Sequence, residues 1–206
     1  MDTAVLQESI LELVALCAGA YLLGSISSAI LLCRAFGYPD PRTQGSSNPG
    51  ATNVMRVAGK LLAAATLAAD VAKGVIPAAI ALWVLDLPAQ AAALAGLFAV
   101  IGHVAPVFFR FRGGKGVATA FGLLFTLHWP SGLVAGAAWL LVFAMLRISS
   151  VASLAAFLAT PVAVGFWLPE ALWPMIALTV VLFVRHHSNI RKLLTGEELG
   201  FGRREE

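Results

Sequence analysis

Two stretches of the sequence combine glycine, small polar side chains and one cation in a pattern suited to binding anions. The first runs from Gly45 to Arg56 and reads Gly-Ser-Ser-Asn-Pro-Gly-Ala-Thr-Asn-Val-Met-Arg. The second runs from Gly113 to Thr119 and reads Gly-Gly-Lys-Gly-Val-Ala-Thr. Glycines let backbone N–H groups turn toward a ligand, and a nest of such groups beside a cation attracts negative charge. The pattern therefore predicts anion binding, with Arg56 and Lys115 as the cations.

The second stretch is not expected to be a nucleotide-hydrolysing loop. Such loops have the spacing Gly-x-x-x-x-Gly-Lys-Ser/Thr and follow a strand, and the sequence shows neither feature here. Basic residues and glycine turns also occur as plain lipid anchors and chain reversals. That simpler interpretation is the one we adopt for Arg110, Arg191, Lys192, Arg203 and Arg204.

The composition places these polar stretches in a membrane protein. The chain has 206 residues, of which 59% are hydrophobic and 12% charged, and its mean hydropathy is +0.85. Soluble domains carry about 25% charged residues, so this surface cannot face water all round. Several continuous apolar runs approach or exceed the roughly 20 residues that a spanning helix needs. The expected fold class is an all-α integral membrane protein, and the net charge of +3 is too small to indicate nucleic-acid binding.

Seven membrane-spanning helices are predicted in a single multi-pass domain, residues 1–206. A polar loop, residues 35–59, separates the first two. The region 117–146 admits two interpretations, one long kinked helix or two short, tilted helices joined by a turn, because Trp129-Pro130-Ser131-Gly132 interrupts it. The expected spans, with a short fourth and fifth, are residues 10–33, 60–84, 89–109, 117–128, 132–146, 151–168 and 171–184.

The basic residues favour the turn and set the orientation. Of the fourteen Lys and Arg residues, only Lys73 lies inside a predicted span. With a hairpin at Pro130 the other thirteen share one side of the membrane, whereas a single pass would place Arg147 on the opposite side. Positive residues stay cytoplasmic. We therefore expect the N-terminus outside, the C-terminus in the cytoplasm, and both polar stretches on the cytoplasmic face.

Further polar residues fall at the same cytoplasmic ends. Ser149, Ser150 and Ser153 open the sixth predicted span, and His186, His187 and Asn189 follow the seventh. Donors from several helix ends on one face can build a small polar site on a helical bundle. The two cysteines, Cys17 and Cys33, lie about 24 Å apart on one predicted helix, so neither a disulfide nor a metal site is expected.

Asp70, Lys73 and His103 are ionisable residues within the predicted spans. Asp70 and Lys73 are three positions apart on one helix and can pair. Charges at membrane depth are costly and usually face the interior of a bundle. We favour structural support for the pair, with a direct chemical role left open. His103, near the end of the third span, is either a buried hydrogen-bonding residue or a base close to Lys115.

At these residues the chain resembles the bacterial acyl-phosphate:glycerol-3-phosphate acyltransferases, the PlsY family. The resemblance runs nearly from end to end, with one departure at Ser47, where the family usually has glycine. If that position needs a positive φ, Ser47 is strained or the loop differs. The matching motifs are Gly24-Ser25-Ile26, residues 45–54 with Arg56, residues 70–74, Gly102-His103, Pro106 to Phe109, residues 113–119, residues 149–153, and Arg185-His186-His187 with Asn189.

The resemblance implies an enzyme of the bacterial cytoplasmic (inner) membrane that acts on its cytoplasmic side. It would transfer a fatty acyl group from acyl phosphate to the sn-1 hydroxyl of glycerol 3-phosphate, giving lysophosphatidic acid and phosphate. This is the first acylation of phospholipid synthesis. Acyl-CoA and acyl carrier protein are not expected as donors, no metal or cofactor is expected, and an upstream enzyme would form the acyl phosphate.

The resemblance also assigns residues to the site in three groups. Expected to be catalytic are Ser46, Arg56, Lys115, Ser153, His186 and Asn189. Expected to bind substrate phosphate or shape the loops are Gly45, Asn48, Gly50, Thr52, Asn53, Gly113, Gly114, Gly116 and Thr119. Expected to support the site are Asp70, Lys73 and His103.

The chemistry agrees with that reaction. Both substrates carry phosphate, so a site needs at least two cations and many N–H donors. Acyl phosphate is already activated, so positioning and charge stabilisation can suffice. A Ser–His nucleophile remains an alternative to direct transfer, and the substrate's own phosphate is a candidate proton acceptor. A phosphate transporter would use similar residues, but transporters tend to have internal repeats and midplane sites, and this sequence shows no convincing repeat.

Overall fold

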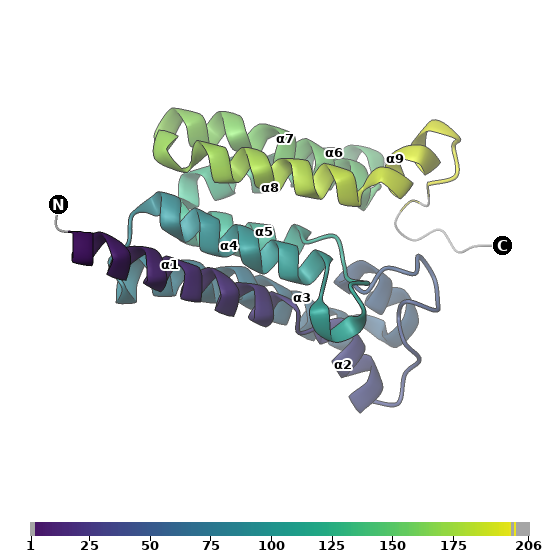
Figure 1. The fold of residues 1–206 in the computed structure, drawn as a ribbon. Coiled ribbons are helices and arrows are strands. Elements are labelled where there is room, and N and C mark those ends of the chain that lie inside the picture. Colours follow the sequence, from purple (N-terminus) through teal and green to yellow (C-terminus); the bar gives the residue numbers. More distant parts are fainter. Residues whose placement is uncertain (1–2, 199, 201–206) are drawn as a thin grey trace. The chain divides into compact units, whose positions relative to one another are not determined.

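The computed structural model describes residues 3–198 and 200, and all regular secondary structure in that part of the chain is helical (Figure 1). Arg203 and Arg204 lie outside the described residues. The chain divides into two compact units, Met1–Leu127 and His128–Glu206.

The first unit is built around one central helix. Its helices are α1 (Thr3–Gly24), α2 (Ser28–Ala35), α3 (Ala51–Ala79), α4 (Ala89–Val104) and α5 (Val117–Leu127), with a π-helical turn, Ile80–Val84, extending α3 and a 3₁₀ turn, Val107–Phe109, following α4. Helix α4 packs against α1, α3 and α5, and most of its small side chains are buried. It is the core of this unit.

Glycines let these helices approach closely. A Cβ on Gly24 of α1 would collide with the carbonyl of Ala99 in α4, and one on Gly74 of α3 would collide with the carbonyl of Thr119 in α5. Small residues at such crossings are the usual means by which membrane helices bring their backbones together.

Helix α3 begins earlier than the sequence indicated. We predicted a loop from residue 35 to 59, but the structure starts the helix at Ala51, with Gly50 as its N-cap, and places the kink at Gly59 (φ 85°). The prediction was wrong because it relied on polarity. Residues 51–58 contain no proline or glycine, so nothing in them opposes a helix. The second half of the first polar stretch, including Asn53 and Arg56, therefore lies on a helix.

The second unit consists of α6 (Trp129–Leu146), α7 (Ser149–Trp167), α8 (Leu172–Arg185) and α9 (His187–Leu194), with a 3₁₀ turn, Pro169–Ala171, before α8. Helix α7 packs against both α6 and α8. The sequence placed a turn at residues 129–132, but these residues form the first turn of α6. Pro130 is tolerated there because its missing N–H has no partner in a first turn. His128 caps the helix, and its Nδ1 accepts a hydrogen bond from Ser131 N at 3.3 Å.

Within the part of the chain that the structure describes, five helical segments are long and apolar enough to cross a membrane: Ile10–Ala35, Ala51–Val84, Ala89–Phe109, Trp129–Leu146 and Ser149–Trp167. The bent pair Pro169–Arg185 and His187–Leu194 would make a sixth, and α5 is shorter. The first segment is interrupted at Ser25–Ser27, between α1 and α2. One long helix over residues 117–146 is excluded, and the fifth predicted span is longer than expected, at 18 residues. The count of seven stays a prediction.

Candidate functional site

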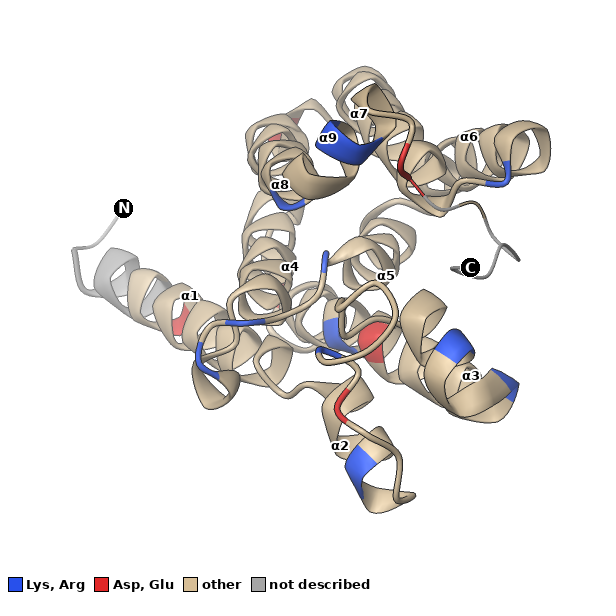
Figure 2. Ribbon diagram, turned by 90° about the vertical axis from the view of Figure 1, so that its right-hand side faces the viewer, with Lys and Arg blue, Asp and Glu red and all other residues tan. Residues whose placement is uncertain are grey.

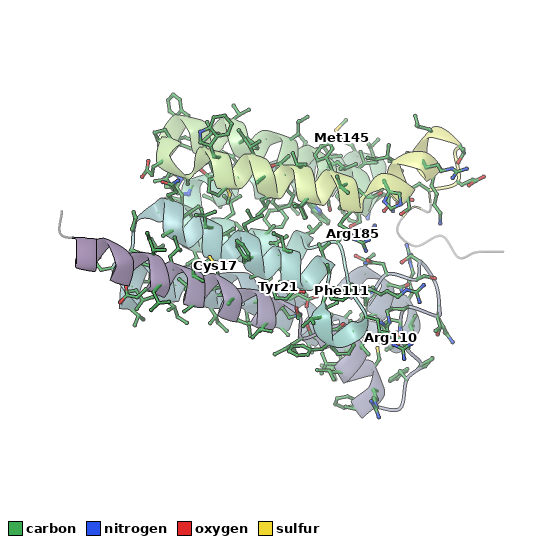
Figure 3. All side chains as sticks on the ribbon, viewed as in Figure 1. Cys17, Tyr21, Arg110, Phe111, Met145 and Arg185 are labelled. Carbon is green, nitrogen blue, oxygen red and sulfur yellow. The ribbon has the colours of Figure 1, made fainter. Side chains whose placement is uncertain are left out.

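The polar ends of the first unit gather at one end of its helices. In Figure 1 the end of α1, helix α2, the start of α3 and the start of α5 lie together, and Figure 2, which faces that end, shows basic residues on α2, on the start of α3 and in the connecting loops. Tyr21 of α1, marked in Figure 3, donates a hydrogen bond from its hydroxyl to Ala105 O at 2.9 Å. This bond ties α1 to the end of α4.

Arg42 joins the loop after α2 to the turn after α4. It donates from Nη1 to Phe109 O at 3.2 Å and forms an ion pair with Asp40, Nη2 to Oδ2, at 2.7 Å. The side-chain hydrogen bond from Arg42 lowers the pKa of Asp40 below its usual value. Beyond Phe109, both Arg110 and Phe111 have positive φ (59° and 57°), and this left-handed pair, labelled in Figure 3, turns the chain toward the second polar stretch.

The first polar stretch is held by one buried side chain, that of Asn53. Its Oδ1 accepts from Ser46 N at 2.9 Å, and its Nδ2 donates to Pro41 O at 2.8 Å and to Gln44 O at 3.0 Å. Both Gly45 (φ 55°) and Ser47 (φ 56°) are left-handed. Ser47 therefore occupies a conformation that suits glycine, as the resemblance suggested it would if the loop were unchanged.

The predicted members of this stretch lie near its surface. Ser46 is exposed, Asn48, Gly50 and Thr52 are half-buried, and Arg56 is exposed on the second turn of α3. An exposed serine hydroxyl beside a fixed backbone and an exposed guanidinium can both reach a ligand arriving from outside the unit.

The second polar stretch is packed against the end of α4, and its glycines are required for different reasons. A Cβ on Gly113 would collide with the carbonyl oxygen of His103, and one on Gly114 would collide with the His103 ring. Gly116 has φ 83°, which disfavours a side chain. Gly114 N also donates to His103 O at 3.1 Å. Lys115, half-buried, is thereby carried on a tightly confined backbone.

The buried ionisable residues of the first unit form one cluster that includes Ser28, which the sequence analysis missed. Lys73 Nζ donates to Asp70 Oδ1 at 2.6 Å and to Ser28 Oγ at 2.7 Å, and Ser28 Oγ donates to Asp70 Oδ1 at 2.5 Å. His103 Nδ1 lies 3.6 Å from the same carboxylate oxygen. The expected pairing of Asp70 with Lys73 is confirmed. Nothing in the sequence around Ser28, a serine within an apolar run, indicated that it contacts Asp70 and Lys73.

Thr119 is fully buried at the start of α5. Its Oγ1 has no hydrogen-bond partner, and the same holds for Thr66 on α3. The expected role of Thr119 in binding phosphate stays a prediction. Its backbone carbonyl lies where a Cβ on Gly74 would have to sit, so it also contributes to the α3–α5 approach.

The second unit holds the remaining predicted residues. Ser153 Oγ donates to Ser149 O at 2.8 Å and accepts from Trp139 Nε1 at 3.2 Å. His186 is buried, and its Nδ1 lies 2.7 Å from Leu182 O. Because a carbonyl oxygen only accepts, Nδ1 carries a proton.

Asn189 is positioned by a residue that the sequence analysis missed. Its Nδ2 donates to Glu198 Oε1 at 2.6 Å, and the same oxygen accepts from Ser150 Oγ at 2.5 Å. The Asn189 Oδ1 atom is buried and has no hydrogen-bond partner. Glu198 lies in a charged tail after α9, and only its acidic type distinguished it in the sequence.

The structure thus places Ser46, Arg56 and Lys115 in the first unit and Ser153, His186 and Asn189 in the second. Among residues 3–198 and 200, no group of three His, Cys, Asp or Glu side chains is arranged to hold a metal ion. Within each of the two units the described residues form packed helices, several of them long and apolar enough to span a membrane, and this defines a helical integral membrane protein.

Comparisons with known proteins define the family. The family model described as glycerol-3-phosphate acyltransferase matches residues 14–196. The glycerol-3-phosphate acyltransferase of Pseudomonas paraeruginosa is 53% identical over 88% of this chain and 96% of its own length, and that of Methylococcus capsulatus is 49% identical over 89% and 93%. The chain belongs to the glycerol-3-phosphate acyltransferase family and is an acyltransferase.

Solved structures support the same assignment. The crystal structure of PlsY (YgiH), an integral membrane glycerol 3-phosphate acyltransferase, in its glycerol 3-phosphate form has a TM-score of 0.88 at 37% identity, covering 93% of this chain and 96% of that one. Its lysophosphatidic acid form has a TM-score of 0.86 with the same identity and coverage.

Proposed function

We propose that this protein transfers a fatty acyl group from acyl phosphate to the sn-1 hydroxyl of glycerol 3-phosphate, giving lysophosphatidic acid and phosphate. This would be the first acylation step of phospholipid synthesis. The observation that carries the proposal is the family match over residues 14–196, a range that includes all six residues expected to be catalytic. Glycerol 3-phosphate is proposed as the acceptor because it stands in the names of the relatives. Acyl phosphate is proposed as the donor because the sequence resembles the PlsY family.

The phosphate groups of the two substrates need cations, and the proposal gives these roles to Arg56 and Lys115. Charge-assisted hydrogen bonds to phosphate are among the strongest that side chains make. The glycines before Lys115 keep its backbone tightly packed against the end of α4, and the Ser46 N–H is already used by Asn53. Ser46 would therefore act through its exposed hydroxyl, which orients a substrate oxygen.

Acyl phosphate contains an activated acyl group, so the reaction needs no covalent enzyme intermediate. The acceptor oxygen attacks the acyl carbon, the acyl–phosphate bond breaks, and the proton of the hydroxyl passes to a phosphate oxygen of the substrates. His186, Asn189 and Ser153 of the second unit would orient the reacting groups.

We also propose seven membrane spans in one functional domain of the bacterial cytoplasmic membrane: α1 with α2, then α3, α4, α5, α6, α7 and α8. The N-terminus would lie outside and the polar ends in the cytoplasm, as the one-sided distribution of basic residues supports. In a variant lacking Cys17 and Cys33, Arg147→Cys should resist an impermeant thiol reagent added to intact cells. Labelling at this position would contradict the orientation.

The donor is tested with purified protein in detergent, supplied with glycerol 3-phosphate and either acyl phosphate or acyl-CoA of the same chain length. Acyl phosphate should support formation of lysophosphatidic acid, and acyl-CoA should not. An upstream enzyme that forms acyl phosphate would then be needed in the cell. Equal rates with the two donors would contradict the proposed donor while leaving the acyltransferase family intact.

A further inference from the structure

His103 occupies the last turn of α4 and lies between two parts of the first unit that the sequence does not connect. One is the buried cluster of Ser28, Asp70 and Lys73. The other is the second polar stretch, which carries Lys115. The three side chains of the cluster and that of His103 are almost fully buried, with exposed fractions of 7% for Ser28, 2% for Asp70, 4% for Lys73 and 8% for His103.

The two edges of the imidazole ring face different partners. Nδ1 lies 3.6 Å from Asp70 Oδ1. The opposite edge, with Nε2, lies where a Cβ on Gly114 would have to sit. The ring therefore fills the space between the carboxylate and the loop backbone.

The backbone of His103 contacts the same loop. Its carbonyl oxygen accepts from Gly114 N at 3.1 Å and limits the space at Gly113. A single residue thus contacts both glycines that precede Lys115, through its carbonyl oxygen at Gly113 and Gly114 and through its ring at Gly114.

Two hydrogen bonds fix the Asp70 carboxylate in its position beside the His103 ring. Its Oδ1 accepts from Lys73 on the same helix and from Ser28 on α2, so the carboxylate cannot turn away without breaking two short bonds in a buried site. The cluster joins α2 and α3, and His103 extends it to α4 and to the loop before α5.

We propose that His103 is a positioning residue, through which the Ser28–Asp70–Lys73 cluster fixes the backbone of residues 113–116 and thereby places Lys115 for a substrate phosphate. This inference rests on the proposed function for the role of Lys115. It assigns to the buried cluster an effect on substrate binding, in addition to any effect on stability.

The close contact at Gly114 provides a direct test, because it involves only side-chain atoms of His103. Gly114→Ala should displace the ring or the loop and lower kcat/KM. His103→Ala should raise KM for glycerol 3-phosphate by about 10- to 100-fold, since a misplaced cation weakens binding in the ground state and in the transition state alike. A merely structural role would reduce the amount of active enzyme and leave KM unchanged.

Combining the two changes gives the decisive comparison. With the ring removed, the new methyl group at position 114 has room. The kcat/KM of the double variant should therefore be about 5- to 100-fold higher than the value expected if the losses of the two single variants multiplied. Gly113→Ala is the matched control, because its collision is with the carbonyl oxygens of His103 and Val104 and with Pro106 Cδ, and truncating the His103 side chain removes none of these atoms. The kcat/KM of the double variant Gly113→Ala, His103→Ala should lie within about 2-fold of the value expected if the two single losses multiplied.

A second measurement is independent of turnover. The rate at which an amine reagent modifies Lys115, read on its peptide by mass spectrometry, should rise several-fold in His103→Ala and stay near the wild-type rate in His103→Gln, which keeps a polar side chain in the gap. Gel filtration identifies variants that do not fold. If His103→Ala aggregates, His103→Asn takes its place in the comparison of single and double variants.

The two proposals fail separately. If wild-type protein transfers no acyl group to glycerol 3-phosphate, the proposed function fails, and the labelling of Lys115 still tests the positioning role. If the wild type is active but the Gly114 and His103 changes multiply as the control does, with KM and Lys115 labelling unchanged, the positioning role is overturned and the function stands.

Discussion

The two polar stretches of the first unit have similar compositions but are held in opposite ways. In the stretch from Gly45 to Arg56, residues 45–47, 55 and 56 are exposed, and one buried side chain, Asn53, organises the stretch through three hydrogen bonds. The stretch from Gly113 to Thr119 is packed against α4, and its shape depends on the absence of side chains. The stretch from Gly45 to Arg56 therefore tolerates a strained backbone at Ser47, whereas the stretch from Gly113 to Thr119 leaves no room for a methyl group on Gly113 or Gly114.

The largest effects should come from the two cations. Arg56→Ala and Lys115→Ala should each lower kcat/KM by about 30- to 1000-fold, equivalent to about 2–4 kcal/mol, since each loses a charge-assisted bond to phosphate. Steady-state kinetics with both substrates varied provides the measurement.

Conservative changes at these positions sharpen the comparison. Arg56 is exposed on a helix, while Lys115 lies in a confined loop, so Arg56→Lys should retain more activity than Lys115→Arg, whose planar fork does not replace a point charge. If either alanine variant kept wild-type kinetics, that residue would have no part in binding phosphate.

The next largest effect should come from Asn53→Ala. Removing this side chain leaves the Ser46 N–H and the carbonyls of Pro41 and Gln44 without their partner, which should lower the free energy of unfolding by about 1–3 kcal/mol. Because these bonds hold Ser46, kcat/KM should also fall by about 10- to 100-fold.

Thr43→Ala is the matched control for Asn53. Thr43 Oγ1 also donates to a loop carbonyl, that of Asp40, at 2.8 Å, but it is exposed. Its loss should change stability by less than about 0.5 kcal/mol. Equal activity losses in the two variants, measured beside thermal unfolding in detergent, would show that the loop does not depend on Asn53.

The smallest effect is expected at Ser47. Ser47→Gly removes the strain of a left-handed serine, about 1 kcal/mol, but adds the backbone entropy of glycine, about 0.5–1 kcal/mol. Stability should therefore change by less than about 1 kcal/mol. Ser47→Ala keeps the strain and should be the less stable variant. A melting temperature higher for Ser47→Ala than for Ser47→Gly would contradict the left-handed loop.

The sequence predicted the helical membrane class and the pairing of Asp70 with Lys73 because both follow from local composition and spacing. Apolar runs in a chain with few charges leave only helices as a solution. Charges three residues apart on a helix lie on one face. For Ser47 the resemblance left two alternatives open, a strained serine or a different loop, and the structure shows a positive φ of 56° at this residue.

Other features depend on contacts distant in sequence and gave no local signal. Ser28 joins Asp70 across 42 residues, and Glu198 joins Ser150 across 48. The start of α3 at Ala51 was missed because polar residues that serve a site are also compatible with a helix. The reason for Gly114 is visible only when the His103 ring is seen beside it. Sequence shows which residues are small and polar, while packing decides what each of them does.

The central claim is a direct acyl transfer between two phosphate-bearing substrates, and simultaneous measurement of phosphate and lysophosphatidic acid tests it most directly. Purified protein is mixed with acyl phosphate, with and without glycerol 3-phosphate, and quenched at times shorter than one turnover. Direct transfer predicts equal amounts of the two products when the acceptor is present, and no phosphate burst or acylated peptide when it is absent. A burst of phosphate without acceptor, together with an acylated peptide containing Ser46, would contradict it.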